Sequence, residues 1–350
     1  MNYPFAIIKR WKLWLLIAGL LSAGSIAMFF WTVRYSIQFT GGMEFVVSTK
    51  DVQPSVQQDI EGALSQAWYK DFSVWLWSKD GYASILIQTD VDSNEVVEQI
   101  AKTVTSTLLA KQVIPNVDAI LEQSVIGPSV GDYITKSAQK ALIWGMVFMG
   151  AYILFAFAGM RDFVSPGLLG LITVLTMIFD IIVPSGAYGV LMGVNQAVQV
   201  DMIFIVGLLT IMGYSINDTI IILDRVRENF FLHEGQLSKG KISRADIFEM
   251  SVWQTMRRSI GTSMTTFLVV IIMYVFGTGV LKMFAFTLAF GVLSWSYSSI
   301  FVAIPLTYLW SGGEKAKLRE KTKDPTESHR EHMTHAQASA HSTHSQKKRK

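Results

Sequence analysis

Two acidic side chains and one arginine lie in long apolar stretches of this chain: Asp180, Asp218 and Arg258. Asp218 follows an apolar run that starts at Met202, so it lies about 16 residues into a helix, roughly 24 Å deep at 1.5 Å per residue. An ionisable group at that depth costs several kcal/mol unless it is protonated, paired or hydrated. Protonation converts a carboxylate into a neutral form that is cheap in low dielectric, so these residues could form a proton pathway.

Polar residues at helical spacing accompany each of these three charges. The stripes comprise Thr173, Thr176, Tyr214, Asn217, Thr262 and Thr265. We expect them to face the interior of a helical bundle, because lipid offers their hydrogen-bonding groups no partner. Two alternatives remain open. The acids could be structural groups held by neighbouring helices, and Arg258 could be a boundary residue that extends its charge into water.

Other kinds of chemistry find little support in the sequence. The chain has no cysteine, which excludes disulfides, cysteine-bound metals and thiol catalysis. No histidine falls within an apolar stretch, the acids are far apart, and neither a nucleophile–base pair nor a phosphate-binding loop is recognisable. We therefore predict neither an enzyme nor a bound metal or cofactor.

The composition is that of an integral membrane protein, because 51% of the residues are hydrophobic and only 16% are charged. Apolar runs predict six spans at residues 14–33, 141–160, 166–188, 202–223, 259–276 and 283–310. The first run has the basic start of a signal peptide, but it has nearly the length of a full span, so we interpret it as an uncleaved anchor. The predicted domains are 1–33 (N-terminus and first span), 34–139 (extracytoplasmic), 140–312 (a five-helix bundle with a cytoplasmic loop at 224–257) and 313–350 (tail).

Charge between the spans predicts the orientation. Basic residues concentrate at 9–12, 161, 225–258 and 315–350, all on one side of a six-span arrangement, and the 34–139 insert lies on the other. The positive-inside rule then places both termini in the cytoplasm. The tail is basic and His-rich and cannot form a core, so we expect it to be disordered and to contact anionic membrane lipids rather than a specific nucleic acid.

The insert predicts a small α+β domain. Strands are expected at 43–48, 72–77, 83–88 and 117–125, and helices at 54–68 and 94–110. The order βαββαβ is that of the ferredoxin-like fold, between the first two spans. We expect Trp68, Trp75 and Trp77 to fill the core and cover the sheet of this domain rather than to form a binding cage.

The fourth predicted span contains the most distinctive sequence of the chain. It reads Gly213-Tyr214-Ser215-Ile216-Asn217-Asp218-Thr219, followed by Asp224-Arg225-Val226-Arg227-Glu228-Asn229. It resembles the signature of the SecF family, membrane subunits of the bacterial Sec protein-export machinery within the resistance-nodulation-division superfamily. Further matches, in order, are Phe39-Thr40-Gly41-Gly42, Ile126-Gly127-Pro128-Ser129-Val130-Gly131, Arg258-Ser259 with Thr262-Ser263-Met264-Thr265-Thr266, and Ser296-Tyr297-Ser298-Ser299-Ile300-Phe301.

The chain departs from this family at three positions. Gln38 stands where the family usually has an acid, and Trp295 stands where a glycine is common. Phe179, just before Asp180, stands where the family usually has a histidine. Asp218 and Arg258 match the positions of the family's proposed proton-pathway residues.

The resemblance implies a subunit that uses the proton-motive force to promote preprotein translocation across the bacterial inner membrane. Its implied partners are SecD, SecYEG, YajC and, indirectly, SecA, together with the preproteins themselves. Two other functions remain: a small-molecule or lipid exporter of the same superfamily, and a passive assembly scaffold whose charges only hold subunits together. A single domain of about a hundred residues favours the first function over an exporter.

Overall fold

The computed structural model describes residues 5–49, 53, 55–67, 72–79, 82–89, 94–160, 163–195 and 198–312. Six helices in this part of the chain are long and apolar enough to cross a membrane, which confirms the predicted six spans. They are α1 (Trp11–Thr32), α5 (Pro128–Ala156), α6 (Pro166–Val194), α7 (Met202–Leu232), α9 (Arg244–Phe276) and α10 (Gly279–Ser298), the last continued by a π-helical segment (Ser299–Ala303) and α11 (Ile304–Trp310). The predicted tail at 313–350 and Trp68 lie outside the described residues.

Several helices extend beyond the predicted spans. Most of the predicted connection at 224–257 is helical, because α7 continues to Leu232, a short α8 spans Glu234–Ser238, and α9 begins at Arg244. Hydropathy marks only the part of a helix that suits lipid, whereas a cap sets where the helix starts. Ser243 and Asp246 form a capping box at the start of α9, in which the Ser243 hydroxyl accepts from the Asp246 amide at 3.2 Å.

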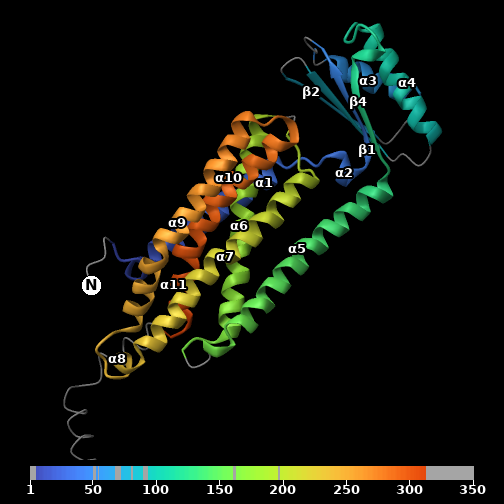
Figure 1. Ribbon diagram of the computed structural model, residues 1–350. Coiled ribbons are helices and arrows are strands. Elements are labelled where there is room, and N and C mark those ends of the chain that lie inside the picture. Colours follow the sequence, from blue (N-terminus) through green and yellow to red (C-terminus); the bar gives the residue numbers. More distant parts are fainter. Residues whose placement is uncertain are drawn as a thin grey trace, which may run out of the picture.

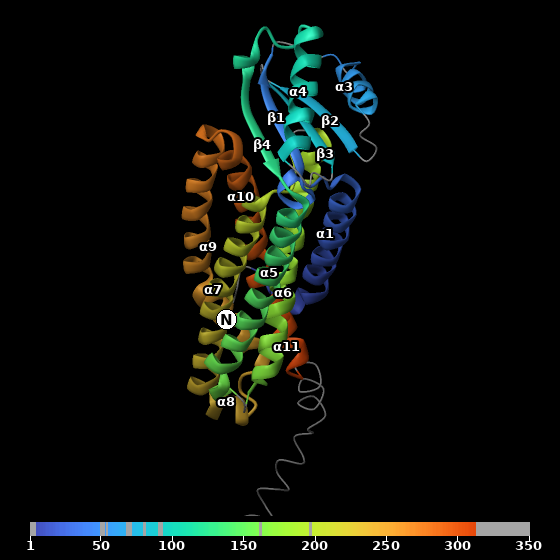
Figure 2. The same cartoon turned by 90° about the vertical axis from the view of Figure 1, so that its right-hand side faces the viewer.

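The bundle is arranged around α10, which packs against α6, α7 and α9 (Figures 1 and 2). Helix α1 packs on α6, and α5 packs on α6 and α7. The approach of α1 to α6 is close enough that a Cβ atom on Gly186 would overlap Ser25. Small residues at a contact let two membrane helices pack backbone to backbone.

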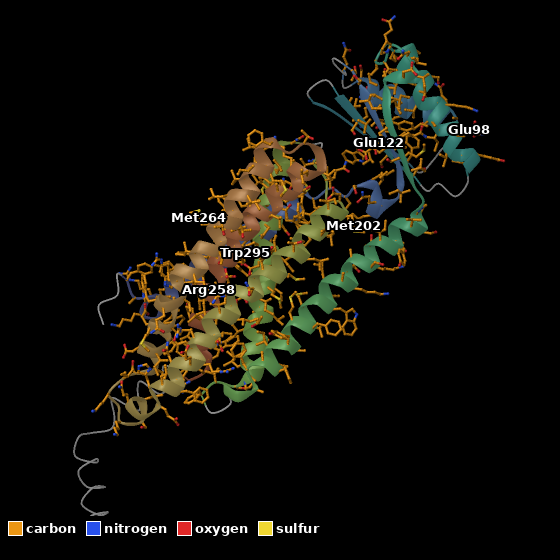
Figure 3. All side chains as sticks on the ribbon, viewed as in Figure 1. Glu98, Glu122, Met202, Arg258, Met264 and Trp295 are labelled. Carbon is orange, nitrogen blue, oxygen red and sulfur yellow. The ribbon has the colours of Figure 1, made fainter. Side chains whose placement is uncertain are left out.

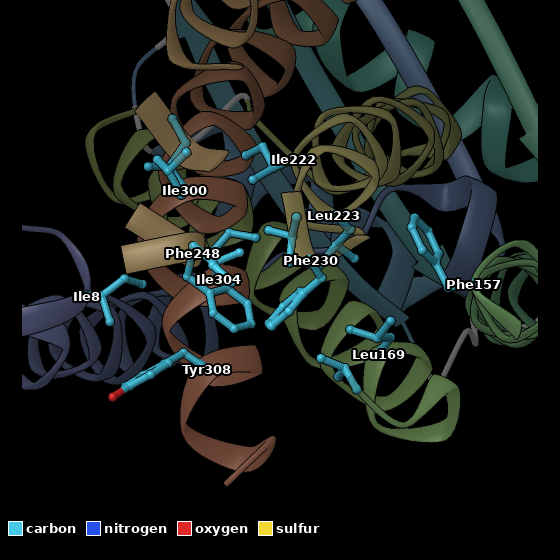
Figure 4. Packing of buried hydrophobic residues seen from close by; sticks show 14 of the residues in the cluster. Ile8, Phe157, Leu169, Ile222, Leu223, Phe230, Phe248, Ile300, Ile304 and Tyr308 are labelled. Carbon is cyan, nitrogen blue, oxygen red and sulfur yellow. The ribbon is translucent and has the colours of Figure 1, made fainter. Parts of the chain in front are cut away.

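The end of the bundle remote from the soluble domain is closed by a large hydrophobic cluster (Figure 4). Ile8, just before α1, and Tyr308 of α11 lie in it with Phe230 of α7 and Phe248 of α9. Glu249 is buried beside it and accepts from the amides of Ile7 at 2.8 Å and Ile8 at 2.9 Å. The start of α1 is therefore fixed to α9 by both apolar packing and hydrogen bonds.

The soluble domain has the predicted order βαββαβ. Its elements are β1 (Gly42–Ser48), α3 (Ser55–Gln66), β2 (Phe72–Lys79), β3 (Tyr82–Thr89), α4 (Asn94–Ala110) and β4 (Ile120–Ile126). The sheet has the order β2-β3-β1-β4 with antiparallel neighbours, as expected for a ferredoxin-like domain. The predicted start of the last strand is wrong by one turn, because residues Val117–Ala119 form a 3₁₀ turn.

Alternate strand residues point to α3 and α4 and form the domain core, including Phe45, Ile85 and Ile87. Trp75 lies on the sheet and not in this core, because its side chain is 49% exposed. Trp75 lies on the edge strand β2 and alternates with Val74, which is buried in the core. The side chain of Trp77 lies outside the described residues.

Domain and bundle meet at a junction of two glycine-containing segments. Gly42 opens β1 with a φ of 122°, and a Cβ atom there would overlap the Ile87 carbonyl oxygen. On the other side of the junction, a Cβ atom on Gly131, in the first turn of α5, would lie 3.0 Å from the Phe39 carbonyl oxygen. Gly42 pairs directly with Ile126 at the end of β4, so the chain enters and leaves the domain at one place.

A second tie joins the segment after α1 to the loop before α7. Tyr35 forms an isolated parallel bridge with Val200, and the Val200 amide donates to the Arg34 carbonyl at 2.7 Å. Gln38, which stands where the family usually has an acid, accepts from the Met202 amide at 2.8 Å. The Gln38 side chain thus satisfies one of the free backbone amides at the start of α7.

Candidate functional site: two intramembrane carboxylates

Asp180 of α6 is fully buried and is surrounded by hydroxyl groups. Its Oδ2 accepts from Ser215 Oγ of α7 at 2.5 Å and from Ser298 Oγ of α10 at 2.7 Å, and its Oδ1 accepts from Ser294 Oγ at 2.7 Å. Ser294 and Ser298 are four residues apart, so they share one face of α10. One carboxyl group therefore joins three membrane helices.

The threonines of the same stripe do not take part in this cluster. Thr173 donates to the Leu169 carbonyl at 2.9 Å, and Thr176 donates to the Thr173 carbonyl at 2.9 Å. Hydroxyls bound to their own helix carry no interhelical contact. The polar stripe does face the interior of the bundle as expected, but its hydrogen-bonding role rests on Asp180.

Asp218 of α7 is 4% exposed and lies in a second, separate polar chain. Its Oδ2 accepts from Ser263 Oγ of α9 at 3.3 Å, and that Ser263 oxygen accepts from Trp295 Nε1 of α10 at 3.3 Å. Trp295 is buried, and its ring stacks on Tyr214 with centroids 5.3 Å apart. The residue that replaces a glycine common in the family is therefore part of the site.

Arg258 lies within electrostatic reach of Asp218. None of the ion pairs among the described residues joins them, and the arginine side chain is exposed on α9. Figure 3 shows Arg258 and Trp295 in the middle part of the bundle, on α9 and α10. A fixed positive charge thus stands near the acid without neutralising it by direct contact.

Four predicted supporting residues lie on the outside of the bundle, contrary to expectation. Tyr214, Asn217, Thr262 and Thr265 are all exposed. No described hydrogen bond joins the first two to Asp218, and both threonine hydroxyls donate to carbonyls of their own helix. Spacing along α7 and α9 says which residues share a face, whereas packing decides which face is buried within this chain.

The charged end of the fourth-span motif forms surface pairs and one interhelical contact. Arg225 pairs with Glu228 at 2.6 Å, and Arg227 lies 3.8 Å from Asp224; both pairs are solvent-exposed. Exposed pairs of this kind contribute at most about 1 kcal/mol. The contact is made by Asn229, which is buried and donates to Ser251 Oγ of α9 at 2.8 Å and to Gln254 Oε1 at 2.8 Å. Gly213 lies on the exposed face of α7.

The serines that bind the carboxylates were not recognised from the sequence. Ser215, Ser263 and Ser298 appear in the sequence analysis only as parts of motifs, and Ser294 does not appear there, although Ser294 and Ser298 at i and i+4 in the sixth span are a usable signal. Among the described residues, no group of three or more His, Asp or Glu side chains is placed to hold a metal ion. The arrangement is suited to holding and exchanging protons on two separate carboxyl groups.

Fold and site together define a multi-pass membrane protein with one ferredoxin-like domain and carboxylates buried between its helices. The family model described as "Protein export membrane protein SecD/SecF, C-terminal" matches residues 99–313. The chain belongs to the SecD/SecF family of protein-export membrane proteins.

Relatives within this family are similar over most of their length. The chain is 29% identical to the protein translocase subunit SecF of Thermobaculum terrenum over 90% of this chain and 97% of the relative. It is 32% identical to the SecF subunit of Desulfurispirillum indicum over 79% of this chain and 82% of that one.

A solved structure has the same fold. The crystal structure of SecDF from Thermus thermophilus, described as a translocon-associated membrane protein, superposes with a TM-score of 0.69 at 24% identity. The match covers 89% of this chain and 39% of that chain. This chain therefore spans well under half of the SecDF polypeptide.

Proposed function

We propose that this chain acts as the SecF subunit of a bacterial protein-export machinery and uses the proton-motive force, together with SecD, to promote preprotein translocation. The observation that carries the proposal is Asp218, a carboxyl group buried between membrane helices. It has a hydroxyl donor, Ser263, and within reach the charge of Arg258, which forms no ion pair with any residue that the structure describes. Asp180, which accepts from three serines, is the second acid of the proposed proton pathway, and Asp218, with one described hydroxyl donor, is its main protonation switch.

The physical mechanism follows from the charge of Asp218. Ionised, it is attracted to Arg258 and is a good acceptor for Ser263; protonated, it loses the attraction and becomes a donor. Protonation thus changes the relative stability of arrangements of α7 against α9. One charge crossing the membrane field is worth about 2.3 kcal/mol per 100 mV, enough to change a two-state population ratio by about 50-fold.

The exposed polar face of α7 and α9 supports association with SecD. Tyr214, Asn217 and Arg258 lie on this face, and lipid would leave their polar groups without partners. The chain has no cysteine, so a single Asn217→Cys would report contacts there without background from this subunit. We expect it to cross-link to SecD, while Leu20→Cys on the exposed side of α1 does not; equal cross-linking from both would contradict this interface.

We further propose the bacterial inner membrane as the location, both termini in the cytoplasm, and cooperation with SecYEG, YajC and SecA. The support is the charge asymmetry of the loops and the similarity to SecF subunits. The role is transport, with no covalent reaction performed by this chain. Reporter fusions within the soluble domain and after Ser311 test the orientation, and a cytoplasmic signal from the domain would overturn it.

Asp218→Asn tests the proton step, because it mimics the neutral acid with little change in volume. We expect the complex to assemble and the ATP-driven step to persist, while stimulation of preprotein translocation by an imposed proton gradient in membrane vesicles is lost. Asp224→Asn, an exposed acid of the same helix, is the matched control and should respond like the wild type. A full gradient response by Asp218→Asn would refute the proton role, and failure to assemble would favour a scaffold.

A further inference from the structure

The Ser263 hydroxyl of α9 is bonded differently from the neighbouring hydroxyls of that helix. Thr262 and Thr265 donate to carbonyls of their own helix, as serine and threonine side chains commonly do. No described hydrogen bond joins Ser263 to a carbonyl of α9. Its described partners are Asp218 of α7 and Trp295 of α10, each at 3.3 Å. Ser263 Oγ therefore lies where three helices meet, and its orientation depends on groups outside α9.

The indole of Trp295 influences which way the Ser263 hydroxyl points. An indole Nε1–H can only donate, whereas a serine hydroxyl has one proton to donate and lone pairs with which to accept. Because Ser263 Oγ accepts from Trp295, its own proton is available to Asp218 Oδ2. The ionised acid suits this arrangement, since it only accepts. A protonated Asp218 that donated to Ser263 would have to compete with the indole for the same oxygen.

The ring of Trp295 is held in place from two sides. It is 2% exposed and stacks on Tyr214 of α7, with centroids 5.3 Å apart and an interplanar angle of 15°. In the same turn of α10, Ser294 and Ser298 both donate to Asp180 at 2.7 Å. Figure 3 shows Trp295 on this helix in the middle part of the bundle. A ring fixed in this way presents its N–H in one direction.

Few other charges lie near this contact. Helix α5 has no Asp, Glu, Lys, Arg or His from 141 to 160, and α10 with its continuation has none from 283 to 310. The charged residue of α6 is Asp180, which accepts from its own three serines. On α9, Arg257 and Arg258 are exposed, and Arg258 is within electrostatic reach of Asp218. Within this chain, the Ser263 hydroxyl is thus the direct contact through which the proton affinity of Asp218 can be adjusted.

We propose that Trp295 is a positioning residue for the proton step: its indole N–H orients the Ser263 hydroxyl toward Asp218 and so sets the pH at which Asp218 exchanges its proton. Without the indole donor, the hydroxyl can turn to a carbonyl of its own helix, as the neighbouring threonines do. The ionised acid then loses a hydrogen-bond donor, and proton uptake becomes easier. This inference rests on the proposed function for the proton role of Asp218. It adds a residue that regulates this role without touching the acid.

The test is an infrared pH titration of the complex with SecD in lipid membranes. The signal is the protonated-carboxyl band that Asp218→Asn removes. Two changes delete the N–H donor: Trp295→Phe, and replacement of Trp295 by benzothienylalanine, which keeps the bicyclic ring that stacks on Tyr214. Each should move the midpoint of the band to higher pH by about 0.5 pH unit, roughly a threefold change in proton concentration, as expected for an average interhelical hydrogen bond in a membrane.

Trp253→Phe is the matched control. It also deletes an indole donor, but this one lies on α9 and donates to Glu249 Oε1 at 3.1 Å, toward the end of the bundle remote from the soluble domain. It should leave the midpoint of the Asp218 band unchanged. An equal shift from Trp253→Phe would show that the effect does not come from the Trp295 contact, and would overturn the proposal.

A double-substitution cycle separates positioning from simple packing. Ser263→Ala should move the midpoint by a similar amount, and Trp295→Phe on that background should add no further shift. A further shift of full size would show that Trp295 acts by excluding water and not through Ser263, and no shift from either replacement of Trp295 would show that it does not act on the acid. Both results overturn the proposal while Asp218 still titrates, so the proposed function stands. If Asp218→Asn removed no pH-dependent band, the proton role itself would fail, and this inference with it.

Discussion

The Asp180 cluster allows a quantitative prediction about what holds the bundle together. Asp180→Ala removes the acceptor of three buried hydroxyls, Ser215, Ser294 and Ser298. Hydrogen bonds to a charged group contribute about 1.5–3 kcal/mol each in water-soluble proteins, which would total roughly 5–9 kcal/mol. Interhelical hydrogen bonds in membrane proteins measure only about 0.6 kcal/mol on average, with a maximum near 1.7, because the membrane-embedded unfolded state finds other partners.

The membrane values apply here, so we expect Asp180→Ala to lower the free energy of unfolding by about 2–5 kcal/mol and Ser298→Ala to lower it by about 1 kcal/mol. Asp180→Asn should cost less than Asp180→Ala, because its amide oxygen still accepts and its nitrogen can donate to a serine oxygen. The assay is unfolding of the purified chain in mild detergent by added SDS, followed by circular dichroism. Thr210→Ala is the control, since that exposed hydroxyl only donates to its own helix.

A loss for Asp180→Ala no larger than that for Ser298→Ala would refute the reasoning. It would mean that the three serine hydroxyls form equally strong hydrogen bonds with other groups when Asp180 is removed, and that apolar packing alone joins α6 to α7 and α10. A loss above about 5 kcal/mol would instead indicate that the membrane values underestimate hydrogen bonds to a buried carboxyl group.

Three further predictions concern other polar groups. Trp295→Phe keeps an aromatic ring but removes the donor to Ser263, and should cost about 1 kcal/mol in the same assay; no loss would contradict that contact. Glu249→Gln leaves one acceptor oxygen for the backbone amides of Ile7 and Ile8, so one of these two amides should exchange hydrogen faster while β1 amides are unchanged. Unaltered exchange at both would refute the tie. Burial raises the pKa of Glu44 above its ordinary value of 4.5, so the folded domain binds more protons than the unfolded one in the interval above pH 4.5. The stability of the domain should therefore fall as pH rises through that interval. Glu44→Gln should remove this dependence, measured by unfolding from pH 4 to 7.

The fold was predictable because its signals are local. Apolar runs of about 20 residues locate the six spans, and alternation with turn residues locates the strands of the soluble domain. Helix ends were less predictable, since the caps of α9 and α5 lie in polar sequence that hydropathy does not register. The exposure of Trp75 was missed because nothing within β2 says whether it is an edge strand.

The site was predictable in its acids and not in their partners. Asp180 and Asp218 are conspicuous because charges are rare in membrane spans. Their partners are serines from other helices, and in sequence Ser263 is indistinguishable from Thr262, which only bonds to its own helix. The rotation of each helix about its axis decides between these cases, and that rotation depends on packing against α10, with Trp295 at the contact.

The glycine junction has a mechanical consequence. Because Gly42 and Ile126 are paired neighbours, the soluble domain stands on a single stalk and not on two separated legs. A single stalk lets the domain tilt as one body, which two legs would resist. Strand β1 has 7 residues and is about 23 Å long at 3.3 Å per residue, so a tilt of about 10° at the stalk displaces its far end by roughly 4 Å. A small movement of α1 or α5 within the membrane is thus amplified into a swing of the outer sheet, with no rearrangement inside the domain.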